Sequence, residues 1–301
     1  MKSLIDLKNL CVHPVDSFYK SHTKVDVLRL DLLHPVISGN KWFKLKTYVE
    51  DAVQNNKKTI LTFGGAYSNH IIATAAVAKD FGLKSIGIIR GEEPEHWSFT
   101  LQESASRYGM QLVFIPREAY KNKQIPSALS ASLNMDETMV VPEGGYGMHG
   151  LNGAKEILQL IDSTPYTHIL SAVGTGTTIA GLVESVTHEQ QVIGISVFKN
   201  NNSLQPEIEN LLSDKRKKSF SLIHDYHFGG YAKYNAGLIE FMNEFYSVTG
   251  IPSDFVYTGK LFFAVNDLIG KKYFTSDVNI LMIHTGGLQG NSSLPKGTLI
   301  F

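Results

Sequence analysis

Cys11 is the only cysteine among the 301 residues of this sequence. A single thiol excludes an internal disulfide and a metal site built from cysteine ligands. An excess of charge of one sign is also absent, because 28 Lys and Arg residues balance 28 Asp and Glu residues. A balanced chain has no overall attraction to nucleic acid or to an anionic membrane surface.

Targeting segments and long apolar runs are missing too. Asp6 and Lys8 interrupt the N-terminal stretch, so this stretch does not fit a secretory signal. No apolar run approaches the roughly 20 residues that a membrane-spanning helix needs. Hydrophobic residues form 43% of the chain and charged residues 19%, which is typical of a soluble globular protein. We therefore expect a cytoplasmic location.

Three local patterns suggest chemistry that other features argue against. The basic run at residues 215–218 follows a polar helical stretch and is typical of a solvated helix end. His224 and His227 resemble a metal pair, but at this spacing on an expected strand they point to opposite faces. No Gly-x-Ser-x-Gly motif of a serine hydrolase is present. We expect neither a nucleic-acid site nor a metal site.

Short β-branched runs alternate with amphipathic helical windows along most of the chain. This alternation predicts an α/β fold with mostly parallel sheets flanked by helices, in which ligands bind at the carboxyl ends of strands. The expected helices cover residues 69–80 and 96–108. The expected strands cover residues 59–63, 85–89, 111–115, 138–141, 167–173, 191–197 and 278–284.

A glycine- and threonine-rich turn, Gly174-Thr175-Gly176-Thr177-Thr178, follows one of these strands and opens a helix. Backbone amides at a helix start, together with three hydroxyls, suit a phosphate dianion. The turn lacks the Lys-Ser/Thr pair of a P-loop, and Ile179 occupies the third glycine position of a dinucleotide fingerprint. The alternative interpretation is a tight turn without a ligand.

Lys41 lies in an apolar and aromatic stretch that includes Ile37, Trp42 and Phe43. An amine buried among such groups loses its charge more readily and can attack a carbonyl group. The alternative is a lysine whose charged end reaches solvent.

Two further turns have similarly open interpretations. Ser68, Asn69 and His70 stand at a helix start that suits an anionic oxygen, or simply caps the helix. Gly286 and Gly287 follow the last expected strand and allow a planar ring to approach the backbone, or form a plain turn.

Read in order, six segments resemble the family of pyridoxal 5′-phosphate (PLP)-dependent 1-aminocyclopropane-1-carboxylate (ACC) deaminases and D-cysteine desulfhydrases. The similarity extends from about residue 24 to residue 287. It implies the two-lobed, tryptophan-synthase-β-like fold (fold type II). The segments are SGNKWFKLK (38–46), AYSNH (66–70), GTGTTIAGL (174–182), GYAKYN (230–235), VYTGK (256–260) and HTGG (284–287).

The resemblance implies a role for each matching position. Lys41 would be the lysine that binds PLP covalently, and Asn69 would hold the 3′-oxygen of the ring. Ser68, Tyr231 and Tyr257 would act near the substrate, whose carboxylate would rest on the helix start at Ser68, Asn69 and His70. The positions implied to contact the cofactor are Lys41, Asn69, Gly174, Thr175, Gly176, Thr177, Thr178, Thr258, Thr285 and Gly286.

Two positions separate the branches of this family. ACC deaminases carry a glutamate after the second tyrosine and a leucine in the last motif, where this sequence has Thr258 and Thr285. The desulfhydrase branch resembles the present chain at both positions. Our hypothesis is that a threonine leaves the ring nitrogen closer to neutral, which is enough for elimination of a good β-leaving group.

The sequence departs from the family at three positions. Phe43 replaces a basic residue, and Glu143 and Tyr146 replace smaller ones. These changes are expected to reshape the substrate side of the pocket.

The resemblance thus predicts a PLP-dependent lyase that converts D-cysteine to pyruvate, sulfide and ammonia. ACC deamination is the first alternative and a non-catalytic phosphate-ligand-binding module the second, and a cysteine-forming synthase of the same fold has a different lysine context. The resemblance also implies a homodimer that acts on a small amino acid. It further implies a large cofactor domain (1–43 and 153–301) and a small domain (44–152).

Overall fold

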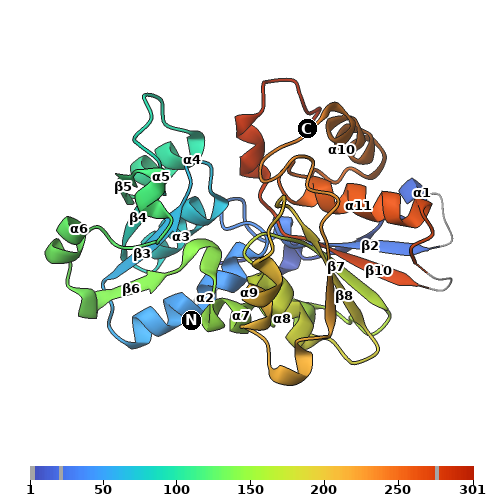
Figure 1. Cartoon of the computed structure of the whole chain (residues 1–301), viewed down its shortest axis with the longest axis horizontal. Helices are drawn as coiled ribbons and strands as arrows, with labels where there is room; N and C mark the ends of the chain where they lie inside the picture. The colour runs from blue at the N-terminus through green and yellow to red at the C-terminus, as the bar shows by residue number, and fades with distance from the viewer. Residues whose placement is uncertain (1–3, 20–22, 275–277) are drawn as a thin grey trace.

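The computed structural model describes residues 4–19, 23–274 and 278–301. Two separate sheets lie side by side, each with helices against it (Figure 1). Both sheets are parallel except for one antiparallel edge strand, as the alternating pattern of the sequence predicts. The predicted α/β fold is confirmed.

The larger sheet has six strands and forms the right-hand lobe in Figure 1. Its central strands are almost wholly apolar because both faces are covered. In spatial order the strands are β1 (Val12–Pro14), β2 (Lys24–Arg29), β10 (Asn279–His284), β7 (His168–Val173), β8 (Gln191–Ser196) and β9 (Phe220–Ile223).

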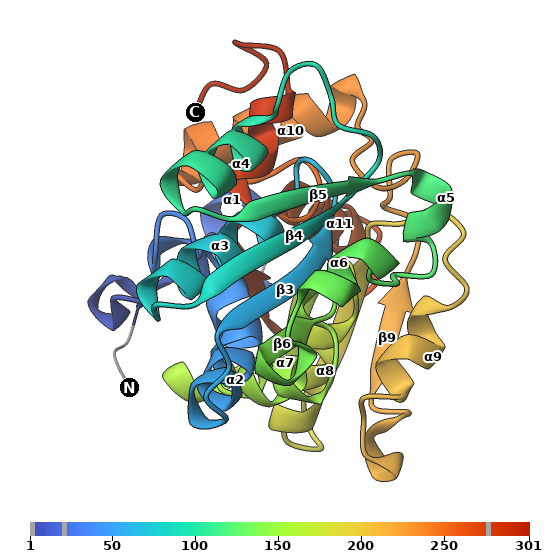
Figure 2. The same ribbon diagram turned by 90° about the vertical axis from the view of Figure 1, so that its left-hand side faces the viewer.

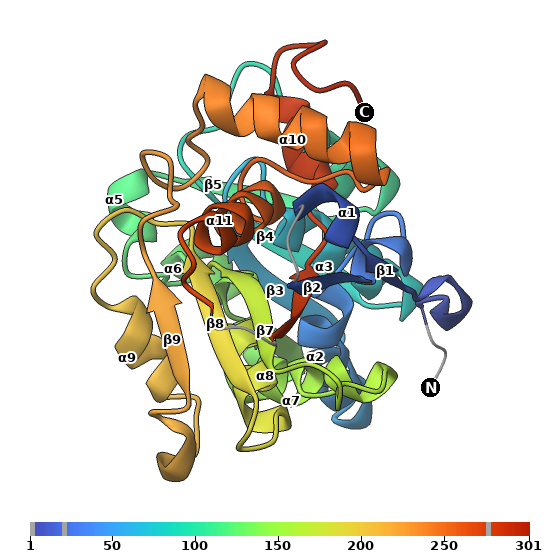
Figure 3. The same ribbon diagram turned by 90° about the vertical axis from the view of Figure 1, so that its right-hand side faces the viewer.

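Successive residues of the larger sheet face two different apolar cores. Ile169 of β7 packs in a core that contains the helix residue Ile179, whereas the next residue, Leu170, packs with Phe262 on the opposite face. This alternation follows from the two-residue repeat of a strand. Helices α10 and α11 cover one face and α7 and α8 the other, as Figure 3 shows from the right-hand side.

The smaller sheet lies in the left-hand lobe and is viewed directly in Figure 2. All of its strands come from the part of the chain between β2 and β7. In spatial order they are β5 (Gln111–Ile115), β4 (Lys84–Arg90), β3 (Thr59–Gly64) and β6 (Thr138–Val141).

The α-helices range from single turns to 14 residues. Those of the first half are α1 (Asp16–Tyr19), α2 (Lys41–Gln54), α3 (Asn69–Asp80), α4 (Phe99–Gln102), α5 (Arg117–Tyr120) and α6 (Ser127–Ser132). Those of the second half are α7 (Met148–Ala154), α8 (Thr177–Ser185), α9 (Leu204–Glu209), α10 (Ala236–Thr249) and α11 (Thr258–Gly270).

Shorter helical turns connect these elements. The 3₁₀ turns are η1 (Leu7–Asn9), η2 (Leu30–Leu32), η4 (Met135–Glu137), η5 (Glu143–Gly145), η6 (Leu158–Leu160), η7 (Asp214–Arg216) and η8 (Leu288–Ser293). A π-helical turn, η3 (Glu103–Arg107), follows α4.

Three sequence predictions need correction. The helix expected over 96–108 begins only at Phe99, where Ser98 caps it, and its second half is a π turn. The basic run at 215–218 begins within the 3₁₀ turn η7 rather than ending an α-helix. His224 and His227 lie beyond the end of β9, so the argument from opposite strand faces was wrong.

The predicted domain boundaries stay a prediction. Helix α2 crosses the first boundary and α7 crosses the second, and these two helices pack against each other between the sheets. Within the described ranges, no helix is long and apolar enough to cross a membrane.

Candidate active site

The turns singled out by the sequence follow strand ends or begin helices that face the junction of the two lobes. Ser68 follows β3, the Gly174 turn follows β7, and Thr285 follows β10. Lys41 is the first residue of α2. Because the strands are parallel, their carboxyl ends gather these turns at the same edge of each sheet.

The Lys41 amine is held by its neighbour. Its Nζ donates a hydrogen bond to Asn40 Oδ1 at 2.7 Å. Burial lowers the pKa of Lys41 to about 8, and the negative charge of Asp254 opposes part of this shift. A substantial fraction of the amine is therefore neutral near pH 8, which fits a nucleophilic lysine better than one directed to solvent.

Asn40 connects this amine to the threonine turn. Its Nδ2 donates to Thr178 Oγ1 at 2.7 Å, while its backbone amide donates to the Thr285 carbonyl at 3.2 Å. Three of the predicted motifs therefore meet at one asparagine that the sequence analysis did not single out. The signal was present, since Asn40 stands beside Lys41 in the Gly-Asn-Lys segment.

The threonine turn has the geometry of an anion cup. Gly176 has a left-handed φ of 82°, and a methyl group there would lie 2.5 Å from Ile208 Cγ1, so only glycine fits. Helix α8 then begins at Thr177, which leaves the first amides of the helix without intrahelical partners. The hydroxyls of Thr175 and Thr177 lie 3.4 Å apart. These groups could hold a phosphate.

The Ser68 turn supplies unpaired polar atoms. Ser68 Oγ caps α3 by accepting from the His70 amide at 3.3 Å, so the capping interpretation holds for that amide. Asn69 Nδ2 donates to the Gly287 carbonyl at 3.2 Å, whereas Asn69 Oδ1 is buried without a partner. Because an unsatisfied buried acceptor costs about 1–3 kcal/mol, this oxygen marks a place for a ligand or water donor.

His70 has a fixed tautomer. The Thr62 hydroxyl donates to the Val141 carbonyl at 2.8 Å, so it can only accept from His70 Nε2, also at 2.8 Å. His70 Nδ1 is then an unprotonated acceptor, buried and without a partner. Burial lowers the pKa of His70 well below its ordinary value, and the charges of Lys44 and Lys41 lower it further. His70 is therefore neutral, and its side chain points inward.

Lys44 is a second buried amine that the sequence analysis missed. It lies one helical turn after Lys41 and is 5% exposed. Burial and the neighbouring Lys41 charge lower the pKa of Lys44 well below its ordinary value. A bound dianion would favour its charged form. The second lysine of the 38–46 segment was the available signal.

The two predicted tyrosines meet across the site. Tyr257 Oη donates to Tyr231 Oη at 3.4 Å, and their rings are 6.1 Å apart at an angle of 72°. Tyr257 also covers the threonine turn, because a methyl group on Gly174 would lie 3.1 Å from its ring. Burial, followed by the nearby Tyr231, raises the pKa of Tyr257 well above its ordinary value, so the phenol is neutral.

Asp254 anchors the start of α11 and was also missed. Its buried carboxylate accepts from the amides of Val256, Tyr257 and Thr258 at 2.7–2.9 Å and from the Thr258 hydroxyl at 2.7 Å. A methyl group on Gly287 would lie 3.0 Å from Asn69 Nδ2 and 3.5 Å from Asp254 Oδ2. The glycine therefore preserves a narrow space between these polar groups, which could admit the edge of a planar ring.

A buried cluster of charged side chains contacts the HTGG segment (284–287). Asp31 accepts two hydrogen bonds from the Arg29 guanidinium at 2.8 and 2.7 Å, and its Oδ1 lies 3.4 Å from His284 Nδ1. The Ser38 hydroxyl donates to the Asp31 carbonyl at 3.4 Å. The cluster thus joins the segment before Lys41 to the turn that follows β10.

The three departures from the family lie in different environments. Phe43 is 2% exposed and belongs to the apolar core that also contains Ile179 of α8, so it is a packing residue of the interior. Tyr146 donates its hydroxyl to the Glu207 carbonyl at 2.9 Å, which directs it toward α9. Of the three, only Glu143 combines a charge with a position near Tyr231 and Tyr257.

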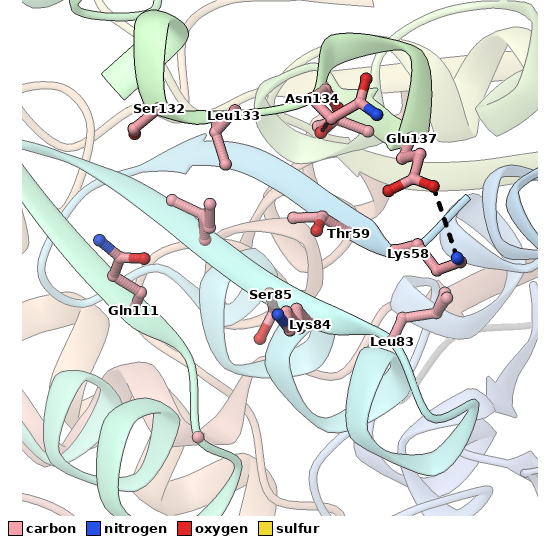
Figure 4. Close-up of a pocket in the computed structure, with 13 residues that line it drawn as sticks. Lys58, Thr59, Leu83, Lys84, Ser85, Gln111, Ser132, Leu133, Asn134 and Glu137 are labelled. Atoms are coloured by element: carbon pink, nitrogen blue, oxygen red, sulfur yellow. Dashed lines mark hydrogen bonds and ion pairs between the residues drawn. The ribbon is translucent and has the colours of Figure 1, made fainter. Parts of the chain in front are cut away.

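A surface hollow lies at the opposite ends of the small-sheet strands. Figure 4 shows Lys58 and Glu137 pointing toward each other there, with an ion pair of 3.4 Å. None of the predicted site residues lines this hollow. In the part of the chain that the structure describes, no group of three His, Cys, Asp or Glu side chains could hold a metal.

Comparisons with known proteins agree with this arrangement. Residues 18–286 match the family described as pyridoxal-phosphate dependent enzyme. A Thermotoga maritima protein with the provisional name 1-aminocyclopropane-1-carboxylate deaminase is 30% identical over 285 residues, covering 88% of each chain. A Salmonella choleraesuis D-cysteine desulfhydrase is 29% identical, covering 88% of this chain and 87% of its own. A crystal structure described as an ACC deaminase homologue has a TM-score of 0.82 at 25% identity, covering 94% of this chain and 90% of the other.

Proposed function

Because the chain belongs to the family of pyridoxal-phosphate-dependent enzymes, we propose that it removes the β-substituent and the amino group of a small amino acid. The proposed substrate is D-cysteine, which would yield pyruvate, sulfide and ammonia. One observation carries the proposal: the Lys41 amine, with its pKa lowered to about 8, is linked through Asn40 to the threonine turn.

The residues present fit PLP. A buried acceptor without a partner on Asn69 and the space preserved by Gly287 suit a polar ring. The threonine turn would hold the phosphate, with Lys44 as a nearby positive charge, and Lys41 would bond to the aldehyde. When bound, PLP supplies an electron sink that stabilises negative charge on the α-carbon of the substrate.

The chain's own groups would bind the substrate and move its protons. The helix start at Ser68 and Asn69 would receive the substrate carboxylate. The α-proton would pass to Lys41, or to Ser68 assisted by a tyrosine, since these are the basic or hydroxyl groups of the predicted site. Tyr257 donates to Tyr231, so the pair would present the Tyr231 hydroxyl proton to orient the β-substituent.

The rival activity is ACC deamination, which the names of the Thermotoga relative and of the crystal structure carry. Thr258 and Thr285 favour the desulfhydrase branch, as argued from the sequence. Sulfide and pyruvate from D-cysteine would support the proposal. Formation of 2-oxobutanoate from ACC, without sulfide from D-cysteine, would replace it.

A Lys41→Ala variant tests the catalytic role directly. We expect loss of the cofactor's protein-bound absorbance, loss of borohydride trapping, and a loss of turnover of at least about 1000-fold. Lys58→Ala is the matched control, because Lys58 is an exposed lysine in the hollow of Figure 4. Unchanged ligand binding and no wild-type turnover would instead indicate a non-catalytic phosphate-binding module.

The homodimer implied by the resemblance remains part of the proposal. Light scattering of the purified protein at several concentrations measures it directly. A mass near the chain's own 33.3 kDa would contradict it.

A further inference from the structure

The small lobe presents a guanidinium that makes no hydrogen bond or ion pair with any described residue. Arg90 is the last residue of β4, at the same sheet edge as the Ser68 turn. Its guanidinium lies over the ring of Tyr120, 5.9 Å from the centroid. Its position is therefore fixed on one side by an aromatic face, while its donors remain available.

Arg90 lies beside the turn that is proposed to bind the substrate carboxylate. Its Nη2 is 3.5 Å from the point that a methyl group on Gly65 would occupy. The Ser68 amide donates to the Gly65 carbonyl at 3.0 Å, so Gly65 and Ser68 belong to one closed turn. The guanidinium is thus adjacent to the substrate side of this turn.

The positive charge of Arg90 is not neutralised by the charged side chains around it. Glu143, the first residue of η5, forms an ion pair of 2.7 Å with Lys123. The charges of Lys123 and Glu143 cancel, so the group formed by Arg90, Lys123 and Glu143 has a net charge of +1. The hydroxyl of Tyr120 is buried beside the Glu143 carboxylate, and burial, followed by this carboxylate, raises the pKa of Tyr120. An anion at this place would meet the guanidinium of Arg90, whose donors are free, while the Glu143 carboxylate is paired with Lys123.

The charges of Arg90 and Glu143 also affect the pKa values of tyrosines in the large lobe. The pKa of Tyr231 is raised, mainly by burial, and the charges of Glu143 and Arg90 act on it in opposite directions. Glu143 also raises the pKa of Tyr257, after larger effects of burial and of Tyr231. The charges of Arg90 and Glu143 therefore act on Tyr231, one of the tyrosines proposed to contact the β-substituent.

We propose that Arg90 binds an anionic group that the substrate carries beyond its β-carbon. Arginine binds carboxylates and phosphates through paired N–H donors, and such charge-assisted bonds are the strong ones. The substrate class would then extend from D-cysteine to amino acids with an acidic β-substituent. This inference rests on the proposed function, since it assigns the substrate side of the same site.

Equilibrium binding to the PLP-loaded enzyme tests the inference without requiring turnover. The probes are 2-amino-4-phosphonobutanoate, which is anionic and has no β-leaving group, and norvaline, which is neutral and of similar length. Both enantiomers of each are titrated by calorimetry. Arg90→Gln should weaken binding of the phosphonate about 10- to 100-fold and binding of norvaline less than about threefold.

Two further variants separate anion binding from a structural effect. Glu143→Gln releases Lys123, so it should tighten phosphonate binding by about threefold or more. Arg117→Gln removes an exposed guanidinium of the following segment, 4.0 Å from a methyl group placed on Gly91, and should change neither affinity. A loss of packing would not make Arg90→Gln weaken phosphonate binding while Glu143→Gln tightens it.

Turnover then distinguishes this inference from the proposed function. O-phosphoserine would release phosphate, pyruvate and ammonia with uptake of one water, and β-chloroalanine would release chloride in place of phosphate. Arg90→Gln should lower kcat/KM for O-phosphoserine selectively. Equal losses for both substrates, or no preference for the phosphonate in any variant, would overturn the role of Arg90. Absence of turnover with intact Arg90-dependent binding would overturn only the proposed reaction.

Discussion

The Thr258 hydroxyl donates to the buried carboxylate of Asp254 at 2.7 Å and accepts from the Asp254 amide at 2.8 Å. Its single proton is therefore directed away from any further partner, and a group that meets this oxygen must act as a donor. The sequence-based hypothesis treated Thr258 as an isolated hydroxyl. In the structure, it is one part of a threonine–carboxylate pair at the start of α11.

Replacement of Asp254 by asparagine should destabilise the protein by about 1–3 kcal/mol. The new NH₂ group would face two donors in place of the oxygen that now accepts from them. Urea unfolding of the PLP-loaded protein measures the effect. Asp267→Asn is the control, because Asp267 is partly exposed near the other end of α11, where it pairs with Lys271 and accepts from the Tyr226 hydroxyl. An amide oxygen can still accept from Tyr226, so this substitution should cost less than about 1 kcal/mol.

The rate at which apoprotein captures PLP should follow the titration of Lys41. A pKa of about 8 leaves the neutral amine at about 9% at pH 7, about half at pH 8 and about 90% at pH 9. The capture rate should therefore rise about fivefold from pH 7 to 8 and less than twofold from pH 8 to 9. Stopped-flow absorbance follows this reaction. A continued tenfold rise up to pH 10 would indicate an ordinary lysine.

His70 should make stability fall in mild acid. Its folded pKa is lowered, so below about pH 6.5 the unfolded chain binds a proton that the folded protein does not. Its contribution should decline by up to about 1.4 kcal/mol per pH unit as the pH falls from about 6.5 toward the lowered pKa. His70→Gln keeps a donor for Thr62 but cannot be protonated, so comparison of the two unfolding profiles isolates the effect. Parallel profiles would contradict the neutral tautomer.

Removal of one charge of the Arg29–Asp31 pair should lower the free energy of unfolding much more than replacement of both residues by apolar ones. Asp31→Asn leaves a buried guanidinium without its counter-charge and should cost about 3–5 kcal/mol. The double variant Arg29→Met, Asp31→Leu removes both charges and should cost clearly less. Urea unfolding of the three proteins measures the difference. A double variant as unstable as the single one would show that the pair is needed for more than mutual neutralisation.

Sequence patterns were sufficient for the elements with strong local signals. The apolar runs that became β3, β7, β8 and β10 were predicted within one residue at each end, because strands covered on both faces need continuous apolar residues. The helix over 96–108 was misplaced since Ser98 starts it later and a π turn interrupts its hydrogen-bond pattern. Such local geometry leaves little trace in hydrophobic periodicity.

The motif residues were identifiable from sequence, but their partners were not. Lys41, the threonine turn and the two tyrosines were recognised by type and order. Asp254 and the acceptor atom of His70 could be recognised only from contacts in the fold. Asn40 stands in the Gly-Asn-Lys segment, but only the structure shows that it bonds to Thr178.

By itself, the sequence determined the α/β class, the family resemblance and the order of the motifs, because hydrophobic period and glycine-rich turns are encoded locally. Only the tertiary structure decided which polar groups satisfy one another and which remain free. The guanidinium of Arg90 is one such free group. It lies beside the Ser68 turn because β3 and β4 are neighbouring strands, and it remains unpaired because Glu143 forms its ion pair with Lys123. Burial and pairing are properties of spatial neighbours, which lie far apart along the chain.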